Sequence, residues 1–245
     1  MFDHVTLRVA DLGRSMRFYD LAFETLEFPG TLYADEHGCE WNDFAFYEGE
    51  PVTRRLHVAF GAPSRQHVVA FWRALTSAGF RDDGAPGPRL QYTPDYYGAF
   101  VLDPDGNSVE AVHHDHVRRD GCVIDHLWLR VRWVEETEGF YSTAASVLDF
   151  ELREGSPEWM VGLRVPGDAG SCSFVSGEQP TQNVHLAFPA PDRATVDEFH
   201  RVALAAGYRD NGPPGERPQY HPGYYGAFVL DPDGNNVEAV FHDRD

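Results

Sequence analysis

Six residues of this chain have the types and positions needed to bind metal ions. Each half of the chain carries two histidines and one glutamate, and each of these residues falls on a separate strand-like run. Two imidazoles and one carboxylate that converge on one face of a sheet form a facial ligand set, which leaves further metal positions open. The candidate ligands are His4, His57, Glu110, His126, His185 and Glu238.

An internal repeat places these residues at matching positions. The segment 91–115 returns 128 residues later as 219–243, with four differences in 25 positions. The same offset relates His57 to His185, and the first histidine of each half follows an aspartate in an Asp-His pair. Because the residues around the first two histidines differ between the halves, repetition of all three residue types favours a shared role over chance.

The repeat also predicts the domain organisation. We expect a first module at residues 1–117, a linker at 118–122 and a second module at 123–245. Each module has the length of a small domain, and each is long enough to bury a core of its own.

Hydrophobic periodicity alternates between strand and helix in the same order within each module. In the first module, strand 4–9 precedes a helix that Asp11 caps. Strand 56–60 precedes a second helix, which Ser64 caps and Gly79 ends. Each helix has an apolar face with the spacing expected of a helix that packs on a sheet.

Two further strands close the first module. They cover residues 99–102 and 108–112, and the segment 103–107, Asp-Pro-Asp-Gly-Asn, forms the turn between them. Each module then contains two β-α-β-β-β units, and the chain contains four. The sequence therefore predicts an α+β fold of two tandem modules with mixed sheets.

The amino-acid composition argues against several classes of partner and of chemistry. The 39 acidic and 20 basic residues give a net charge of −19, which disfavours nucleic acid and anionic membranes as partners. All basic residues are arginine, so Schiff-base and P-loop lysine chemistry are excluded. The three cysteines are far apart, and the first residues do not resemble a signal peptide. We expect a cytoplasmic protein with a small-molecule substrate.

At the candidate ligands the sequence resembles the vicinal oxygen chelate superfamily, which includes glyoxalase I, extradiol dioxygenases and bleomycin-resistance proteins. The resemblance rests on the opening Asp-His-Val/Leu, the internal strand histidine and the closing Phe-Val-Leu-Asp-Pro-Asp-Gly-Asn-x-Val-Glu, and it covers nearly the whole chain. It implies that paired β-α-β-β-β units form a cupped sheet. The cup holds a divalent metal ion, to which the substrate binds through two adjacent oxygens. The implied ligand sets are His4, His57 and Glu110 for one cup, and His126, His185 and Glu238 for the other.

Departures from the family pattern limit the choice of reaction. Glyoxalase I has a carboxylate ligand on the strand before the internal histidine, whereas the corresponding runs here, 44–47 and 173–176, carry no acid. Extradiol enzymes usually have tyrosine ten residues before the glutamate, where this chain has Phe100 and Phe228. The related thiol transferases use a lysine-containing cation site, and this chain has no lysine.

Other residues are candidates for proton transfer or substrate contact beside the metal. His221, Tyr224 and Tyr225 lie shortly before the last ligand, and a histidine there is a natural proton acceptor at neutral pH. Thr93 replaces that histidine in the first module, so we expect the second cup to be the main catalytic site. Trp128 is expected to line that cup as an aromatic wall. The histidines beside the linker, 113, 114 and 116, are expected to be solvated.

Two functions fit these observations. One is a metal-dependent lyase, isomerase or dioxygenase whose substrate chelates the ion through vicinal oxygens; Fe²⁺ or Mn²⁺ is favoured, and Zn²⁺, Ni²⁺ or Co²⁺ is an alternative. The other is a metal-free protein that sequesters a cationic drug, as the bleomycin-resistance relatives do. The sequence leaves open the substrate, the metal and whether the protein is a monomer or a homodimer. Pairing of the units within one chain is the default expectation.

Overall fold

The computed structural model describes residues 1–28, 30, 33–115, 121–153, 157–165 and 171–243. The chain divides into two compact units, of which one comprises Met1–Val5 with Leu129–Asp245 and the other Thr6–Trp128. Most of the expected linker, and His116 beside it, lie outside the described residues. The units do not coincide with the expected sequence modules, because strands β1 (His4–Val9) and β9 (Ile124–Val131) each begin in one unit and end in the other.

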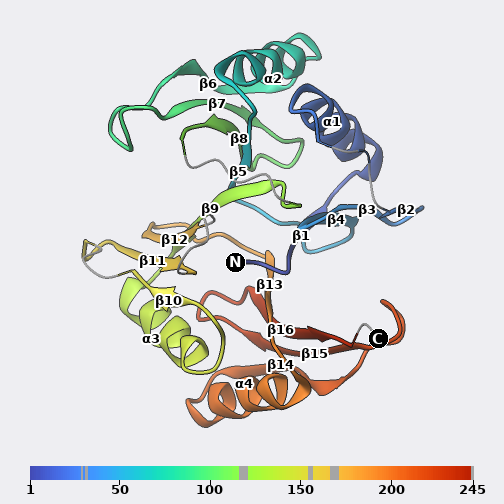
Figure 1. The fold of residues 1–245 in the computed structure, drawn as a ribbon, viewed down its shortest axis with the longest axis vertical. Helices are drawn as coiled ribbons and strands as arrows, with labels where there is room; N and C mark the ends of the chain where they lie inside the picture. The colour runs from blue at the N-terminus through green and yellow to red at the C-terminus, as the bar shows by residue number, and fades with distance from the viewer. Residues whose placement is uncertain (29, 31–32, 116–120, 154–156, 166–170, 244–245) are drawn as a thin grey trace. The chain divides into compact units, whose positions relative to one another are not determined.

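In the described residues of the unit Thr6–Trp128, helices α1 and α2 accompany two groups of strands (Figure 1). Its elements, apart from the parts of β1 and β9, are α1 (Leu12–Thr25), β2 (Tyr33–Ala34), β3 (Gly38–Trp41), β4 (Phe44–Glu48), β5 (Leu56–Gly61), α2 (Arg65–Ser77), β6 (Arg81–Pro88), β7 (Tyr97–Leu102) and β8 (Ser108–His113). The strand orders within this unit are β9-β5-β8-β7-β6 and β1-β4-β3-β2.

The other unit has the same order of elements along the chain. They are α3 (Val134–Ala145), β10 (Glu151–Leu152), β11 (Met160–Arg164), β12 (Ser171–Ser176), β13 (His185–Pro189), α4 (Arg193–Ala205), β14 (Arg209–Glu216), β15 (Tyr224–Leu230) and β16 (Asn236–His242). Its strand orders are β1-β13-β16-β15-β14 and β9-β12-β11-β10. The pairs β5/β8 and β13/β16 are parallel, whereas β7/β8 and β15/β16 are antiparallel. The predicted α+β fold with mixed sheets is therefore confirmed.

The helices form where capping and apolar spacing predicted them. Asp11 and Ser64 accept hydrogen bonds from backbone amides of the first turns of α1 and α2. Helix α2 buries Val68, Phe71 and Leu75, which lie three and four residues apart on one face, against β6, β7 and β8. Among the helices of the described residues, none has both the length and the apolar character needed to cross a bilayer.

The sequence did not predict strands β6 and β14. Their sequences, RDDGAPGP and RDNGPPGE, are rich in glycine and proline, which normally argues against a strand. Both strands lie at the end of their strand order and shift register at Gly84 or Gly212, and an edge strand with a bulge tolerates such residues.

A buried aspartate organises the turn that leads into β16. Asp231 Oδ1 accepts hydrogen bonds from the backbone amides of Asp233 and Asn235, and Oδ2 accepts one from the Asn235 side chain at 3.0 Å. Asn235 Oδ1 accepts from the amide of Val184, the residue before β13. Burial raises the pKa of Asp231 to about 6. Asn235 therefore links the turn to the strand that carries His185.

We expect Asn235→Ala to lower the free energy of unfolding by about 2 kcal/mol, because it leaves buried polar groups without partners. Denaturant unfolding followed by circular dichroism measures the change. Gln182→Ala, which truncates an exposed amide of the same unit, should change the stability by less than about 0.5 kcal/mol. Equal stabilities of the two variants would contradict the role given to Asn235.

Candidate metal centres

The register of β13 and β16 brings two candidate ligands to one face of the sheet. His185 pairs with Asn236, and Ala187 pairs with Glu238. Because residues two apart on a strand point to the same face, Glu238 lies on the face that carries His185. Strand β1 follows β13 in the strand order, and the Asp3 amide donates to the Ala187 carbonyl at 2.9 Å. This contact places His4 beside His185.

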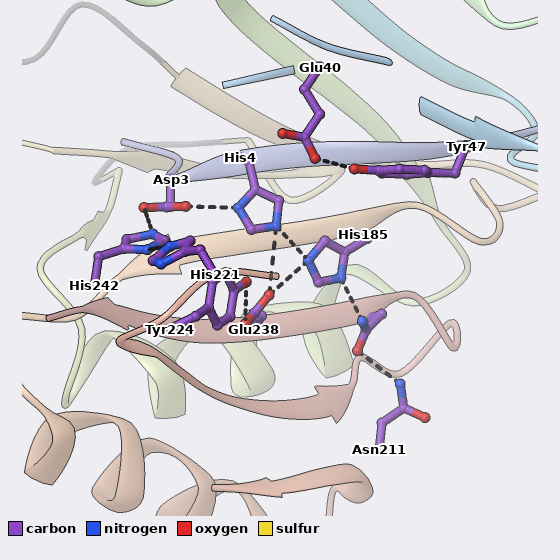
Figure 2. A network of polar contacts seen from close by, with 11 residues as sticks. Asp3, His4, Glu40, Tyr47, His185, Asn211, His221, Tyr224, Glu238 and His242 are labelled. Atoms are coloured by element: carbon purple, nitrogen blue, oxygen red, sulfur yellow. Dashed lines mark hydrogen bonds and ion pairs between the residues drawn. The ribbon is translucent and has the colours of Figure 1, made fainter. Parts of the chain in front are cut away.

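We call His4, His185 and Glu238 the first centre (Figure 2). His185 Nε2 lies 3.1 Å from His4 Nε2 and 3.0 Å from Glu238 Oε2. The distance from His4 Nε2 to the same carboxylate oxygen is 3.7 Å. The Glu238 side chain is 1% exposed, whereas both imidazoles are partly open to solvent. The three donor atoms therefore face one point at the bottom of a partly open site.

The second centre comprises His57, Glu110 and His126, all in the other unit. Here Ala59 pairs with Glu110, so the register repeats that of the first centre. Glu110 Oε2 lies 3.1 Å from His57 Nε2 and 3.5 Å from His126 Nε2. Glu110 is also 1% exposed.

The expected ligand sets were wrong in one respect: the histidines of the first strands are exchanged. His4 lies with His185 and Glu238, and His126 lies with His57 and Glu110. The reason is strand order, since β1 neighbours β13 and β9 neighbours β5. The repeat could not reveal this exchange, because it shows which residue types recur in each half but not which strands become neighbours in the sheets.

A tyrosine at or just before the start of the neighbouring strand, and a glycine within that strand, hold each glutamate. The Tyr224 hydroxyl donates to Glu238 Oε1 at 2.7 Å, and the Tyr96 hydroxyl donates to Glu110 Oε1 at 2.8 Å. A Cβ atom on Gly226 would collide with Glu238 Oε1, so glycine is required there for the carboxylate to fit. The structure thus brings Tyr224 to the first centre as a residue that orients the ligand.

Tyr225, which we expected beside Tyr224 at the site, points elsewhere. Its hydroxyl donates to Asp197 of α4 at 2.7 Å, and the Arg193 guanidinium lies over its ring. Consecutive residues of a strand face opposite sides of the sheet, so Tyr224 and Tyr225 cannot both reach Glu238. The expectation that Tyr225 acts at the centre is therefore wrong.

His221 is the outer end of a chain of polar contacts that reaches the first centre. His221 Nε2 lies 2.8 Å from His242 Nδ1, and His242 Nε2 lies 2.9 Å from Asp3 Oδ2. Asp3 Oδ1 lies 2.8 Å from His4 Nδ1. Figure 2 shows this chain from the loop before β15 to β1. The sequence prediction included His221 but missed Asp3 and His242.

The second centre has a shorter version of this chain. Asp125 Oδ1 lies 2.8 Å from His126 Nδ1 and 3.2 Å from His114 Nε2. His114 was expected to be solvated, but its side chain is only 13% exposed. The repeated Asp-His pair and the matching positions of His114 and His242 were the sequence signals for these residues.

Burial and hydrogen bonding set the charges at the centres. Burial raises the pKa of Glu238 to about 7. Burial also pushes the Glu110 pKa upward, but hydrogen bonds with His126 and His57 outweigh it, and the pKa is lowered. For His126, burial disfavours the charge, yet hydrogen bonds to Asp125 and Glu110 raise the pKa to about 9. A metal ion entering the second centre would displace a proton from His126, so binding should strengthen with rising pH.

We expected Trp128 to lie with His185 and Glu238. The structure instead places it at the second centre. Its ring centroid is 6.4 Å from that of His57 and 5.8 Å from that of Tyr92, in edge-on arrangements. It therefore lines the centre that contains His126, two residues before it on β9.

The donor separations at both centres fit a divalent ion. Donors that bind an ion at about 2.1 Å lie about 3.0 Å apart when their bonds are perpendicular, and about 3.4 Å apart in a tetrahedron. The observed separations run from 3.0 to 3.7 Å, which covers this range and extends slightly beyond it. Within the described part of the chain, no hydrogen bond reaches the buried Glu238 Oε2. A buried carboxylate oxygen directed at two imidazoles is the partner that a cation requires.

Fold and site together define a tandem protein with two His-His-Glu clusters on mixed sheets. The model of the glyoxalase/bleomycin resistance protein/dioxygenase superfamily matches residues 1–111 and 123–239, and the chain belongs to this superfamily. A comparison with curated protein sequences gives no match.

Among solved structures, the chain resembles glyoxalase I from Zea mays. The two share 18% identity with a TM-score of 0.69, over 98% of this chain and 92% of the other. A Bacillus subtilis protein described as a candidate dioxygenase shares 14% identity with a TM-score of 0.65, over 99% and 85% of the two chains. At these identities the likeness establishes the fold alone.

Gly226→Ala should reduce metal binding at the first centre by at least about 10-fold, since the added methyl group displaces the carboxylate from its place between the imidazoles. Isothermal titration with Co²⁺ measures the affinity. Gly139→Ala on α3 adds the same methyl group at ordinary contact distance from its neighbours and should leave the affinity unchanged. Unchanged binding in Gly226→Ala would show that Glu238 is not a ligand.

Proposed function

We propose that this chain is a divalent-metal-dependent enzyme that binds a small substrate through two adjacent oxygens. The single observation that carries the proposal is the burial of Glu238, with one carboxylate oxygen directed at His4 and His185. A buried carboxylate without a cation costs free energy that the fold would have to offset elsewhere. Binding a metal ion removes this cost.

The ligands proposed are His4, His185 and Glu238 at the first centre and His57, Glu110 and His126 at the second. Fe²⁺ or Mn²⁺ suits two imidazoles and a carboxylate, and Zn²⁺, Ni²⁺ and Co²⁺ also accept this set. The ion would supply Lewis-acid stabilisation of charge on the substrate oxygens. The reaction would be a lyase, isomerase or dioxygenase reaction of the superfamily.

The first centre is proposed as the main catalytic site. Tyr224 holds the carboxylate of Glu238, and Asp3 orients the His4 ring through Nδ1. His221 is part-exposed at the end of the His242–Asp3 chain, where it would accept a proton from bound substrate or pass it to water. Thr93, at the matching position of the second centre, binds Asp95 and offers no such acceptor.

The setting proposed is the cytoplasm, with a small-molecule substrate and a monomeric or homodimeric chain. No disulfide joins Cys39, Cys122 or Cys172 to another of the described residues, which suits a reducing compartment. The net charge of −19 opposes binding to nucleic acid and to anionic membranes.

Protein purified without chelator should carry up to two divalent ions per chain, because the described residues form two complete clusters. His185→Ala and Glu238→Ala should each lower the content by about one ion, measured by inductively coupled plasma mass spectrometry. His37→Ala removes an exposed histidine outside both clusters and should leave the content unchanged. Equally low metal in all preparations, even after Fe²⁺ or Mn²⁺ is added, would instead favour drug sequestration.

Glu238→Gln should reduce turnover more than Glu110→Gln, since only the first centre has the His221 proton acceptor. A panel of catechols, thiol adducts of α-keto aldehydes and cationic antibiotics, screened by thermal shift with added metal, identifies a substrate for this assay. Steady-state kinetics then compares the two variants at saturating metal. Equal losses of kcat would show that the centres contribute alike.

A further inference from the structure

A surface cavity of about 370 Å³ lies against helix α2 in the unit Thr6–Trp128. This volume is in the range of pockets that hold small molecules. The cavity is on the side of the sheet opposite to the second centre. Phe100 of β7 pairs with Glu110 and shares its face, whereas Tyr97, three residues earlier, faces the other side. We call it the α2 cavity; its lining residues are Arg65, Gln66, Val69, Ala70, Arg73 and Tyr97.

The two arginines of the α2 cavity form no ion pair with any of the described residues. The Arg65 guanidinium lies over the Tyr97 ring, 5.4 Å from its centroid, and one of its nitrogens is 3.5 Å from the carbonyl oxygen of Asp95. The Asp95 carboxylate itself accepts from the backbone amide of Asp115. In a chain with a net charge of −19, the α2 cavity therefore presents two guanidinium groups without a neighbouring carboxylate to neutralise them.

The internal repeat contains a second version of this arrangement, in which the charges are satisfied. Both arginines and the tyrosine return 128 residues later as Arg193, Arg201 and Tyr225. Arg193 forms an ion pair with Glu216 at 2.7 Å, and Arg201 forms one with Glu198 at 2.6 Å. Within the described part of the chain, no carboxylate is shared between these two arginines. The arrangement thus accommodates two separate anionic groups, one at each guanidinium.

The α2 cavity lacks most of the acidic residues of the second version. Asp243, which also pairs with Arg193, has its counterpart in Asp115, but Asp115 forms no ion pair with Arg65 in the described residues. Because the remaining acids are replaced by apolar residues, the anionic groups must come from outside the chain if the guanidiniums are to be paired. The residues Val69, Ala70 and Pro88 stand at the positions of Asp197, Glu198 and Glu216.

The spacing of the arginines indicates the shape of the ligand. Arg65 and Arg73 are eight residues apart on α2, which corresponds to about 12 Å along the helix axis. Val69 and Ala70 lie between them and line the same cavity. Guanidinium groups bind carboxylates through paired hydrogen bonds, and apolar side chains favour contact with hydrocarbon. A molecule with a carboxylate at each end and an apolar middle matches this order of charged and apolar groups.

We propose that the α2 cavity is a binding site for a small α,ω-dicarboxylate. One carboxylate binds Arg65 and the other binds Arg73, while the hydrocarbon chain lies against Val69 and Ala70. The Tyr97 ring holds the Arg65 guanidinium in place from the other side. The site is separate from the proposed metal chemistry, because it faces away from the second centre and uses none of the six ligands.

Isothermal titration of full-length protein with suberate tests the site. Arg65→Gln and Arg73→Gln should each weaken binding by about five-fold or more, since each removes one charged anchor at an exposed position. Arg201→Gln makes the same change in the second version, where Glu198 already pairs with the arginine, and should leave the affinity unchanged. Octanoate, which has the same chain length and one carboxylate, should bind about five-fold or more weakly than suberate.

Installing the acids of the second version should close the α2 cavity to the ligand. Val69→Asp with Ala70→Glu supplies an internal carboxylate to the arginines and should abolish suberate binding. Val69→Asn with Ala70→Gln adds side chains of the same size without charge, and it should retain more affinity than the acidic pair. Equal loss in both double variants would contradict competition by charge.

Two further outcomes would overturn the proposal. One is equal affinity for suberate and octanoate, or no binding of suberate to the unmodified protein. The other is suberate binding that survives both arginine substitutions, which would place the ligand elsewhere, including at a metal centre. Chelator-treated protein should bind suberate with unchanged affinity, so the test does not depend on whether either centre binds a metal ion.

Discussion

A carboxylate buried at the bottom of each centre is the constraint on which the surrounding structure depends. Glu110 and Glu238 are 1% exposed, and each must be offset by hydrogen bonds, imidazoles or a cation. Tyr96 and Tyr224 satisfy one oxygen of each carboxylate. The glycine two residues after each of these tyrosines leaves room for it. Much of the repeated closing segment therefore serves to hold one side chain.

The second oxygen of each glutamate connects the fold to the proposed chemistry. It faces two imidazoles whose outer nitrogens contact other polar groups of the same unit. Such contacts fix the direction of a ligand before the ion arrives, which lowers the entropy that binding must overcome. Because the ligands come from parallel neighbours β13 and β16, or β5 and β8, the strand register fixes their separation.

The sequence predicted the parts of the fold in which local signals agree with the final structure. The caps at Asp11 and Ser64 and the alternating strands gave the correct order of elements. The strands β6 and β14 escaped prediction because their glycines and prolines suit an edge position that only the sheet defines. The six candidate ligands could also be identified from the sequence, since the internal repeat carries the same residue types at matching positions in both halves.

The sequence could not predict how these six residues group. A histidine on β1 has the same local surroundings whichever internal histidine it meets, and only strand order decides between them. The repeated Asp-His pair marked Asp3 and Asp125, but their contacts with the histidines that follow them could not be predicted, because neighbours on a strand usually face opposite sides. Both failures have one physical cause: the relevant contacts depend on tertiary pairing and side-chain rotamers.

The exchange of first strands has a consequence for the repeat. Residues 1–117 contain His57 and Glu110 but not His126, and residues 123–245 contain His185 and Glu238 but not His4. Neither sequence module therefore holds a complete centre of its own, although each compact unit does. Where ligands from both modules are needed, metal binding and the folding of the whole chain are coupled, because the site does not exist in an unfolded or divided chain. Each centre can therefore bind metal only if the ligands of both modules are kept. Ser108 and Asn236, which contact the internal histidines, are not ligands, and they differ between the two centres.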